Sequence, residues 1–252
     1  MGFAFRNAWR EIRNNRPFCI FYIVNLTLGL IGFISVDSFK QTLDQKVEAE
    51  SKELLGADLA IRARREITTE ELAAVRNVLP PNSKEIEAVD FFSMAAGPTG
   101  SSRLVKIIAF DQGFPFYGKI ETNLRGPITG EEKNLIHERP FVWIYPELRG
   151  QLNIDLGEEL KIGETKFIVS DLIKEDTGLS FQPAELAPKV FISKKFLEKT
   201  KLLTTGNTAF RNHLFKLPLD ADLEKITNAI TAALLSPEVR VYSHQRVGNR
   251  AG

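Results

Sequence analysis

Hydrophobic side chains are unevenly distributed along the chain, and their densest run lies near the N-terminus. No charged residue occurs between Arg16 and Asp37, an interval of 20 residues from Pro17 to Val36. At about 1.5 Å per residue, a helix of this length spans roughly 30 Å, the thickness of the hydrocarbon core of a bilayer. Phe, Ile, Leu and Val make up twelve of these residues. On insertion scales they favour the membrane by up to about 5 kcal/mol in total. We therefore expect residues 17–36 to form a transmembrane helix.

Two other interpretations fit this run less well. A helix buried in a soluble core rarely stays free of charge over this length. A cleaved signal peptide has a shorter apolar stretch of about 7–15 residues followed by a small-residue cleavage site. The residues after the run, Val36-Asp37-Ser38, offer no such site. Cys19, the single cysteine, lies at the start of the run, which argues against a lipoprotein acylation site and excludes an intrachain disulfide.

Charges on the two sides of the run predict its orientation. Four arginines and one acid precede it: Arg6, Arg10, Arg13, Arg16 and Glu11. Two lysines and four acids follow it closely: Lys40, Lys46, Asp37, Asp44, Glu48 and Glu50. Because positive charge remains on the inner side, we expect a cytoplasmic N-terminus and an extracytoplasmic location for everything beyond Val36. Residues 1–16, which alternate apolar and basic positions, are expected to lie on the inner membrane surface as an amphipathic segment.

A single apolar stripe continues beyond the membrane run. Its positions are Val36, Phe39, Leu43, Val47 and Leu54, at steps of three, four, four and seven residues. This spacing is typical of one helix face, so we expect a stalk helix over residues 37–56, ended by Gly56 as a C-cap. The stalk is either a passive continuation of the membrane helix or a link that transmits motion to the outer domain. The pattern alone favours the passive interpretation.

Residues 57–252 alternate predicted strands and helices in a symmetrical order. Near the start we expect a strand over 57–63, a helix over 68–79 and strands over 86–95 and 104–110. Thr68 and Glu71 have the spacing of a capping box at the start of that helix. Near the end we expect a strand over 212–217, a helix over 222–235 and a strand over 239–243. In the middle, about 118–200, we expect short strands at 141–145 and 189–192, and a strand, a glycine-containing turn and a second strand over 156–169. This pattern predicts an α+β domain of two β-α-β halves with an inserted β-rich subdomain.

Composition and motifs give no indication of catalysis. The formal net charge is +1, which provides no general attraction to nucleic acid. His137, His213 and His244 lie far apart and have no metal-ligand spacing. Residues 178–182, Gly-Leu-Ser-Phe-Gln, break the G-x-S-x-G pattern of a hydrolase nucleophile, and residues 97–100 lack the G-K-[ST] ending of a phosphate-binding loop. We therefore expect no catalytic, cofactor-binding or metal-ligating residues and no enzymatic activity, and an enzyme is the least favoured class.

A group of aromatic residues in the middle of the chain is the one candidate for a ligand-binding surface. They are Phe114, Phe116, Tyr117, Phe141, Trp143 and Tyr145. We expect most of them to belong to the core, while some could line a groove for an apolar ligand such as a lipid.

Several stretches resemble a known family. They are Ala8-Trp9-Arg10-Glu11, Glu53-Leu54-Leu55-Gly56-Ala57-Asp58-Leu59, Arg103-Leu104-Val105-Lys106, Leu156-Gly157-Glu158 and Leu186-Ala187-Pro188-Lys189-Val190-Phe191-Ile192. In order and spacing they are similar to ABC-transporter permeases of the MacB/FtsX-like group, and most similar to YbbP-like permeases. The resemblance covers essentially the whole chain. It implies an inner (plasma) membrane location, with residues 57–252 as a MacB-like periplasmic core domain.

The resemblance also implies partners. These are a cytoplasmic ABC ATPase subunit, a second permease copy or homologue, and the lipid bilayer. The resemblance also allows a periplasmic partner. The implied function is export or extraction of a hydrophobic or lipid-like compound, driven by the ATPase and involving movement of the outer domain. Such permeases continue into further membrane helices, so we expect this chain to be the N-terminal portion of a longer permease, with a truncated gene product as the lesser alternative. The competing function is a single-span anchor whose outer domain binds a ligand or protein, as a sensor or scaffold would.

Overall fold

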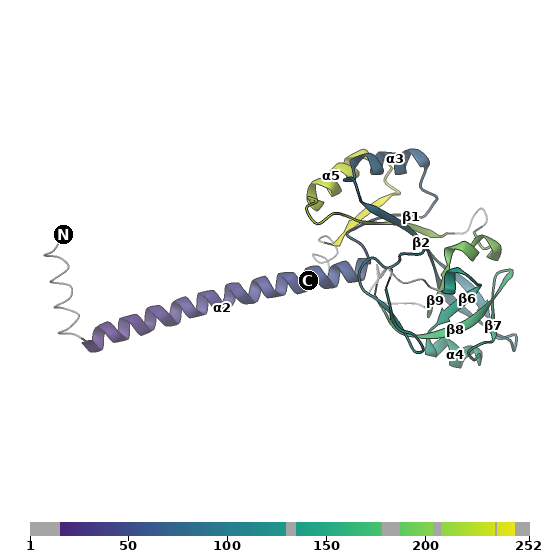
Figure 1. The fold of residues 1–252 in the computed structure, drawn as a ribbon, viewed down its shortest axis with the longest axis horizontal. Coiled ribbons are helices and arrows are strands. Elements are labelled where there is room, and N and C mark those ends of the chain that lie inside the picture. Colours follow the sequence, from purple (N-terminus) through teal and green to yellow (C-terminus); the bar gives the residue numbers. More distant parts are fainter. Residues whose placement is uncertain (1–15, 130–134, 178–186, 204–207, 235, 245–252) are drawn as a thin grey trace. The chain divides into compact units, whose positions relative to one another are not determined.

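The structure is a computed structural model, and it describes residues 16–129, 135–177, 187–203, 208–234 and 236–244 (Figure 1). The chain divides into two compact units, residues 1–47 and 48–252. The predicted amphipathic segment before Arg16 and the motif at residues 178–182 lie outside the described residues.

Helix α2 (Arg16–Leu55) is a single element of 40 residues. Within it, Ile20–Lys40 is the one stretch of the described chain that is long and apolar enough to cross a membrane. Every side chain from Ile20 to Val36 is exposed. Asn25 and Thr27 donate hydrogen bonds to main-chain carbonyls one turn earlier, at 3.2 and 2.7 Å. These two polar side chains thus have partners within the helix, as a hydrocarbon environment requires.

Two β-α-β halves of the second unit form one four-stranded sheet. The first half is β1 (Leu59–Ala63), α3 (Thr69–Val78) and β2 (Lys84–Ala96), and the second is β10 (Phe210–Lys216), α5 (Leu223–Ala233) and β11 (Arg240–Ser243). The strand order is β11-β1-β10-β2, and all neighbours are antiparallel. The two strands of each half are therefore parallel to each other and separated by one strand of the other half. This interleaved order is that of a split β-α-β fold.

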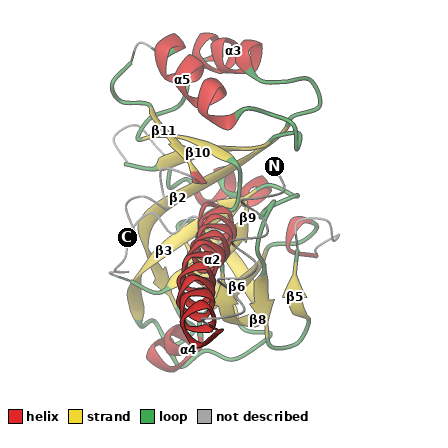
Figure 2. Ribbon diagram, turned by 90° about the vertical axis from the view of Figure 1, so that its left-hand side faces the viewer, coloured by secondary structure: helices red, strands yellow, loops and turns green. Residues whose placement is uncertain are grey.

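Helices α3 and α5 lie side by side on this sheet (Figure 2). Thr68 accepts a hydrogen bond from the Glu71 N–H, and the Glu71 side chain binds the Thr68 N–H, which confirms the predicted capping box. Asp222 caps α5 by accepting a hydrogen bond from the Lys225 N–H. Between helices and sheet lies an apolar core that includes Ile61, Val75, Phe215 and Ile230. Burial of this core holds both helices in place, since helices of this length are marginal alone.

The inserted strands form a second structure around β2. They are β3 (Ser102–Phe110), β4 (Ile120–Thr122), β5 (Gly126–Ile128), β6 (Phe141–Ile144), β7 (Glu159–Ile162), β8 (Thr165–Asp176) and β9 (Lys189–Ser193). The pairings run β2-β3-β9-β6-β8-β7 and return to β2, so that six strands close into a barrel. Strands β2 and β3 belong to this barrel although they precede residue 118.

The barrel is filled by alternate side chains of its strands. Buried members include Phe91, Ile107, Phe167 and Ile192. Two short elements, α4 (Pro146–Leu152) and η2 (Lys194–Phe196), add Leu148, Leu152 and Phe196 to this core. The other short elements are η1 (Leu135–His137) and η3 (Glu198–Thr200). Elements α4, β4 and β5 were not predicted from the sequence. They contain seven, three and three residues, which are too few to show a hydrophobic period.

The long elements lie where the sequence predicts them. The α+β class, the two β-α-β halves and the β-rich subdomain are confirmed. The predicted strand, glycine turn and strand over 156–169 are confirmed as the β7–β8 hairpin. Its first strand begins later than predicted, at Glu159, because Gly157 adopts a positive φ of 88° and forms a turn first. Gly97 and Gly100 form the predicted turn between β2 and β3, where the Gly97 N–H binds the Ser101 carbonyl at 2.8 Å.

A buried polar network joins three neighbouring strands of the four-stranded sheet. Arg62 of β1 donates to Asp90 of β2 and to Asn212 of β10, both at 3.0 Å. The Asn212 amide donates in turn to Asp90 at 2.8 Å and to the Ala88 carbonyl at 3.0 Å. All three side chains are buried, and the Arg62 guanidinium stacks 3.9 Å from the centre of the Phe210 ring. Each charge thus has a partner within the sheet.

Removing the carboxylate from this network should strongly destabilise the second unit. We expect Asp90→Ala to lower the free energy of unfolding by about 3–5 kcal/mol, because Arg62 then keeps a buried charge without its counter-ion. The measurement is chemical denaturation of the full chain in detergent, followed by fluorescence of the buried Trp143 in a Trp9→Phe background. Glu159→Ala, which breaks an exposed ion pair to Lys166, is the control and should change the free energy by less than about 1 kcal/mol. Equal effects of the two substitutions would contradict a central role for the network.

Candidate functional site

The last turn of α2 is built into the second unit, and we treat this helix–domain junction as the candidate functional site. Ser51 and Leu55 are buried, and Leu55 belongs to a core cluster shared with Phe114 and Trp143. Gly56 ends the helix with a φ of 69°, and its N–H binds the Lys52 carbonyl at 2.8 Å. This left-handed geometry confirms Gly56 as the C-cap.

Asp58 connects three segments at the junction. Its carboxylate accepts hydrogen bonds from the Tyr117 hydroxyl at 2.7 Å and from the Leu217 N–H at 2.9 Å. Its main-chain N–H binds the Phe215 carbonyl at 3.0 Å. Burial, followed by the bond to Asp58, raises the pKa of Tyr117, so the tyrosine remains a neutral donor at physiological pH. The start of β1, the loop before β4 and the end of β10 are thereby held together.

A second layer of charges connects the helix to the end of β11. Lys52 pairs with Glu48 one turn earlier at 3.1 Å, and Glu48 lies 3.4 Å from His244 Nε2. His244 also faces the Asp58 carbonyl oxygen, 3.3 Å from Nδ1. The Lys52 hydrogen bond lowers the pKa of Glu48. Burial, aided by the nearby Lys52 charge, lowers the pKa of His244 despite the opposing carboxylates of Asp58 and Glu48. His244 is therefore neutral at neutral pH.

These residues border a small polar hollow of about 360 Å³. Glu48, Lys52, Asp58, Tyr117 and His244 line one part of it, and the turn after β10 lines the rest. The charged groups are already paired with one another. The arrangement therefore holds the helix end in a fixed place, and it presents no nucleophile beside a general base among these described residues.

The histidines that were candidates for metal binding do not come together in the structure. His137 bonds Ser193 at 2.9 Å, and His213 bonds Glu85 at 2.9 Å, so each histidine has a different local partner. Among the residues that the structure describes, no group of three His, Cys, Asp or Glu side chains could hold a metal ion.

The aromatic residues fall into two sets. Phe114 and Trp143 are buried in the core, and Phe141 and Tyr145 pack against the same cluster. Phe116 also packs against this cluster and in addition lines a hollow of the second unit, and Tyr117 lines another hollow. The expectation that most belong to the core is therefore confirmed.

Sequence reasoning missed the residues that form the junction. Asp58, Tyr117 and His244 are far apart in the chain, and no motif connects them. The one signal for this site in the sequence is the stretch 53–59, which contains Gly56 and Asp58 and is among the stretches that resemble MacB/FtsX-like permeases.

The pH dependence of stability follows from His244. Below a pH of about 6.5 the unfolded chain binds a proton at this residue that the folded chain, with its lowered pKa, does not bind, so acidification favours unfolding. Between pH 7 and 5.5 this proton uptake should lower the free energy of unfolding by at most about 1 kcal/mol. In His244→Gln this part of the pH dependence should be absent.

Denaturation of the full chain in detergent at the two pH values is the measurement. His137→Gln is a comparison variant, because burial also lowers the pKa of His137, and its effect should add to that of His244→Gln. An unchanged pH dependence in His244→Gln would show that the residue does not titrate with unfolding.

Comparisons with known proteins support the family resemblance. No family model matches the chain. It is 22% identical over 200 residues to a protein of Escherichia coli K12 described as an uncharacterized ABC transporter permease, YbbP. The match covers 79% of this chain, which spans only 23% of that relative.

One solved structure shares the fold, and a second shows a weaker similarity. The periplasmic region of MacB from Actinobacillus actinomycetemcomitans superposes with a TM-score of 0.50 at 8% identity, over 81% of this chain and 97% of that one. The extracellular domain of the ABC-type transporter YknZ from Gram-positive bacteria gives a TM-score of 0.47 at 9% identity, over 73% and 100%. Together with the permease match, the MacB fold confirms the resemblance to MacB/FtsX-like permeases.

Proposed function

We propose that this chain, which has the sequence resemblance and the fold of MacB/FtsX-like permeases, is the N-terminal portion of an ABC-transporter permease subunit. In this role it couples ATP hydrolysis by a partner ATPase to movement of its outer domain, for export or extraction of a hydrophobic or lipid-like compound. The whole permease would contain a second copy or homologue of this chain.

The observation that carries the proposal is the junction. Helix α2 contains the apolar stretch Ile20–Lys40 and ends in a turn whose Ser51 and Leu55 are buried in the second unit. Asp58 and Tyr117 fix the chain directly after that turn. A continuous helix with such an end has the form of a mechanical link, because displacement of the helix must displace the strands to which its end is bonded.

We propose the predicted segments as the working division of the chain. Residues 17–36 would cross the membrane, residues 37–56 would form the stalk, and residues 57–252 would form the core domain outside. The arginines before the apolar stretch and the acids after it support a cytoplasmic N-terminus. The sequence has no G-K-[ST] phosphate-binding ending, which supports placing ATP hydrolysis in a partner.

Topology can be tested by cysteine labelling in a Cys19→Ser background. Leu219 is fully exposed in the second unit, so Leu219→Cys should react with a membrane-impermeant thiol reagent in intact cells with a permeable outer envelope. Asn7→Cys should react only after the inner membrane is opened. The reverse labelling pattern would contradict the proposed orientation.

The mechanical role can be tested by interrupting α2 below the junction. Lys46 is exposed within the helix, and Lys46→Pro removes a main-chain hydrogen bond at a cost of about 3 kcal/mol or more for a helix interior. In the complete permease with its ATPase, we expect normal insertion and ATP hydrolysis but loss of transport. The measurement is transport in reconstituted vesicles beside hydrolysis in the same sample.

Lys46→Ala, which keeps the helix and removes the same side chain, is the matched control and should transport normally. Full transport by the proline variant would refute the mechanical link. Loss of transport in both variants would point instead to the lysine side chain. For the single-span alternative, the discriminating observation is whether the reading frame continues past Gly252 into further apolar spans.

A further inference from the structure

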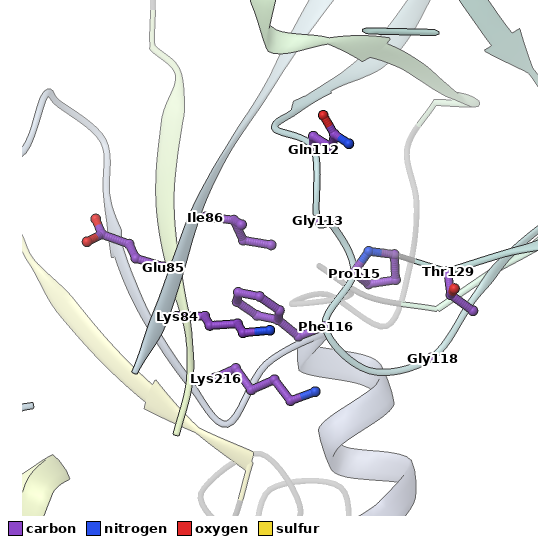
Figure 3. Close-up of a pocket in the computed structure, with 10 residues that line it drawn as sticks. All are labelled: Lys84, Glu85, Ile86, Gln112, Gly113, Pro115, Phe116, Gly118, Thr129 and Lys216. Atoms are coloured by element: carbon purple, nitrogen blue, oxygen red, sulfur yellow. The ribbon is translucent and has the colours of Figure 1, made fainter. Parts of the chain in front are cut away.

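A second hollow of the second unit lies between the β2–β10 pair and the loop before β4 (Figure 3). Its volume is about 820 Å³. Ile86, Pro115 and Phe116 give it an apolar wall, and Gln112 and Thr129 add polar groups on the loop side. We call it the lysine groove, because Lys84 and Lys216 line it.

The two lysines are direct neighbours across the strands. Lys84 of β2 is the register partner of Lys216 of β10. Side chains opposite each other on antiparallel strands have Cβ atoms about 4.5–5.5 Å apart, and like charges there are destabilising. Figure 3 shows both side chains directed toward the loop that carries Pro115 and Phe116. Two positive charges thus converge on the groove.

No carboxylate neutralises this pair among the residues that the structure describes. Glu85 also borders the groove, but its side chain points away from it and binds Arg76 at 2.8 Å and His213 at 2.9 Å (Figure 3). Lys216 Nζ lies over the Tyr117 ring, 5.2 Å from its centroid, and this contact brings no negative charge to the lysine. An oxyanion between the two ammonium groups would relieve their repulsion.

The shape of the groove depends on two glycines of the loop. Gly113 has a φ of 104°, and a Cβ there would lie 3.2 Å from Ile86 Cγ2. Gly118 has a φ of 81°, and a Cβ there would meet the Thr177 side chain. Side chains at these positions would therefore strain the loop and displace it from β2. The close approach of this loop to β2 therefore depends on both glycines.

We propose that the lysine groove binds an anionic amphiphile, that is, an apolar chain with a phosphate or carboxylate head. The head would lie between Lys84 and Lys216, and the chain would lie against Ile86, Pro115 and Phe116. This deepens the proposed function, on which it rests for its role in transport, by assigning a substrate class to a place in the outer domain. Binding itself is independent of transport, so it can be measured on this chain alone.

Three probes separate the contributions of head and chain. We use octyl phosphate, octanol and inorganic phosphate, titrated calorimetrically into the full chain in phosphatidylcholine nanodiscs, with empty nanodiscs as the blank. Octyl phosphate should bind the protein above the blank. Octanol and inorganic phosphate, each of which lacks one of the two parts, should bind at least about 10-fold more weakly.

A double substitution tests the lysines. Lys84→Gln with Lys216→Gln replaces both ammonium groups by neutral amides on side chains only one bond shorter, and it should reduce octyl phosphate affinity about 10-fold or more. The variant should also unfold at a higher denaturant concentration than the original chain, because the like-charge repulsion is gone. That second measurement shows that the loss of binding is not a loss of folding.

The chain offers a matched control outside the groove. Lys161 and Lys166 are likewise register partners on neighbouring antiparallel strands, β7 and β8. Lys161→Gln with Lys166→Gln should leave octyl phosphate binding unchanged.

Equal octyl phosphate binding by the groove variant and the original chain would overturn the proposal. Equal affinity of the original chain for inorganic phosphate and octyl phosphate would also overturn it, because it would show a simple anion site. Failure of transport with binding intact would instead refute the proposed function and leave the groove site standing.

Discussion

The buried contact of Arg62 with Asp90 and Asn212 is the interaction on which the second unit depends. It fixes β1, β10 and β2 side by side, and these strands come from both β-α-β halves. Neither half can complete its own sheet, because the place between its two strands is taken by a strand of the other. A buried ion pair adds little net stability by itself, but an incorrect register would leave its charges unpaired. The network therefore selects the interleaved arrangement over alternatives with the same apolar pattern.

Strand β2 extends this constraint to the rest of the domain. Its first part pairs with β10, its last residues pair with β7, and its other edge pairs with β3. The split β-α-β sheet and the barrel thus share one strand, and neither is an appendage of the other. The junction and the lysine groove meet at one loop. Phe116 of this loop donates its N–H to the Gly56 carbonyl at 3.0 Å, and its side chain lines the groove. The end of the stalk helix and the groove are consequently supported by the same loop.

Local patterns predicted the elements well and the sites poorly, for a physical reason. The apolar run before Asp37, the capping box at Thr68 and the glycine at residue 56 each act within a few residues, so the sequence displays them directly. The closed ring of barrel strands and the neighbouring lysines at positions 84 and 216 arise only from pairings over long separations. No periodicity encodes which strand lies beside which. The three-residue strands β4 and β5 were missed because they contain less than one full repeat of any pattern.

The interleaved topology also determines when the domain can fold during its synthesis. The hydrogen bond from Arg62 to Asn212 joins residues 150 positions apart. The strand that must lie between β1 and β2 is therefore made long after both of them, and contacts of such separation form slowly. If the chain crosses the membrane as it is made, as the proposed orientation requires, most of the domain arrives outside with the edges of β1 and β2 still unpaired. Such edges readily pair with other chains. In that case the segment would need protection outside the membrane until β10 has emerged, and its biogenesis as well as its finished structure would limit which sequences this architecture tolerates.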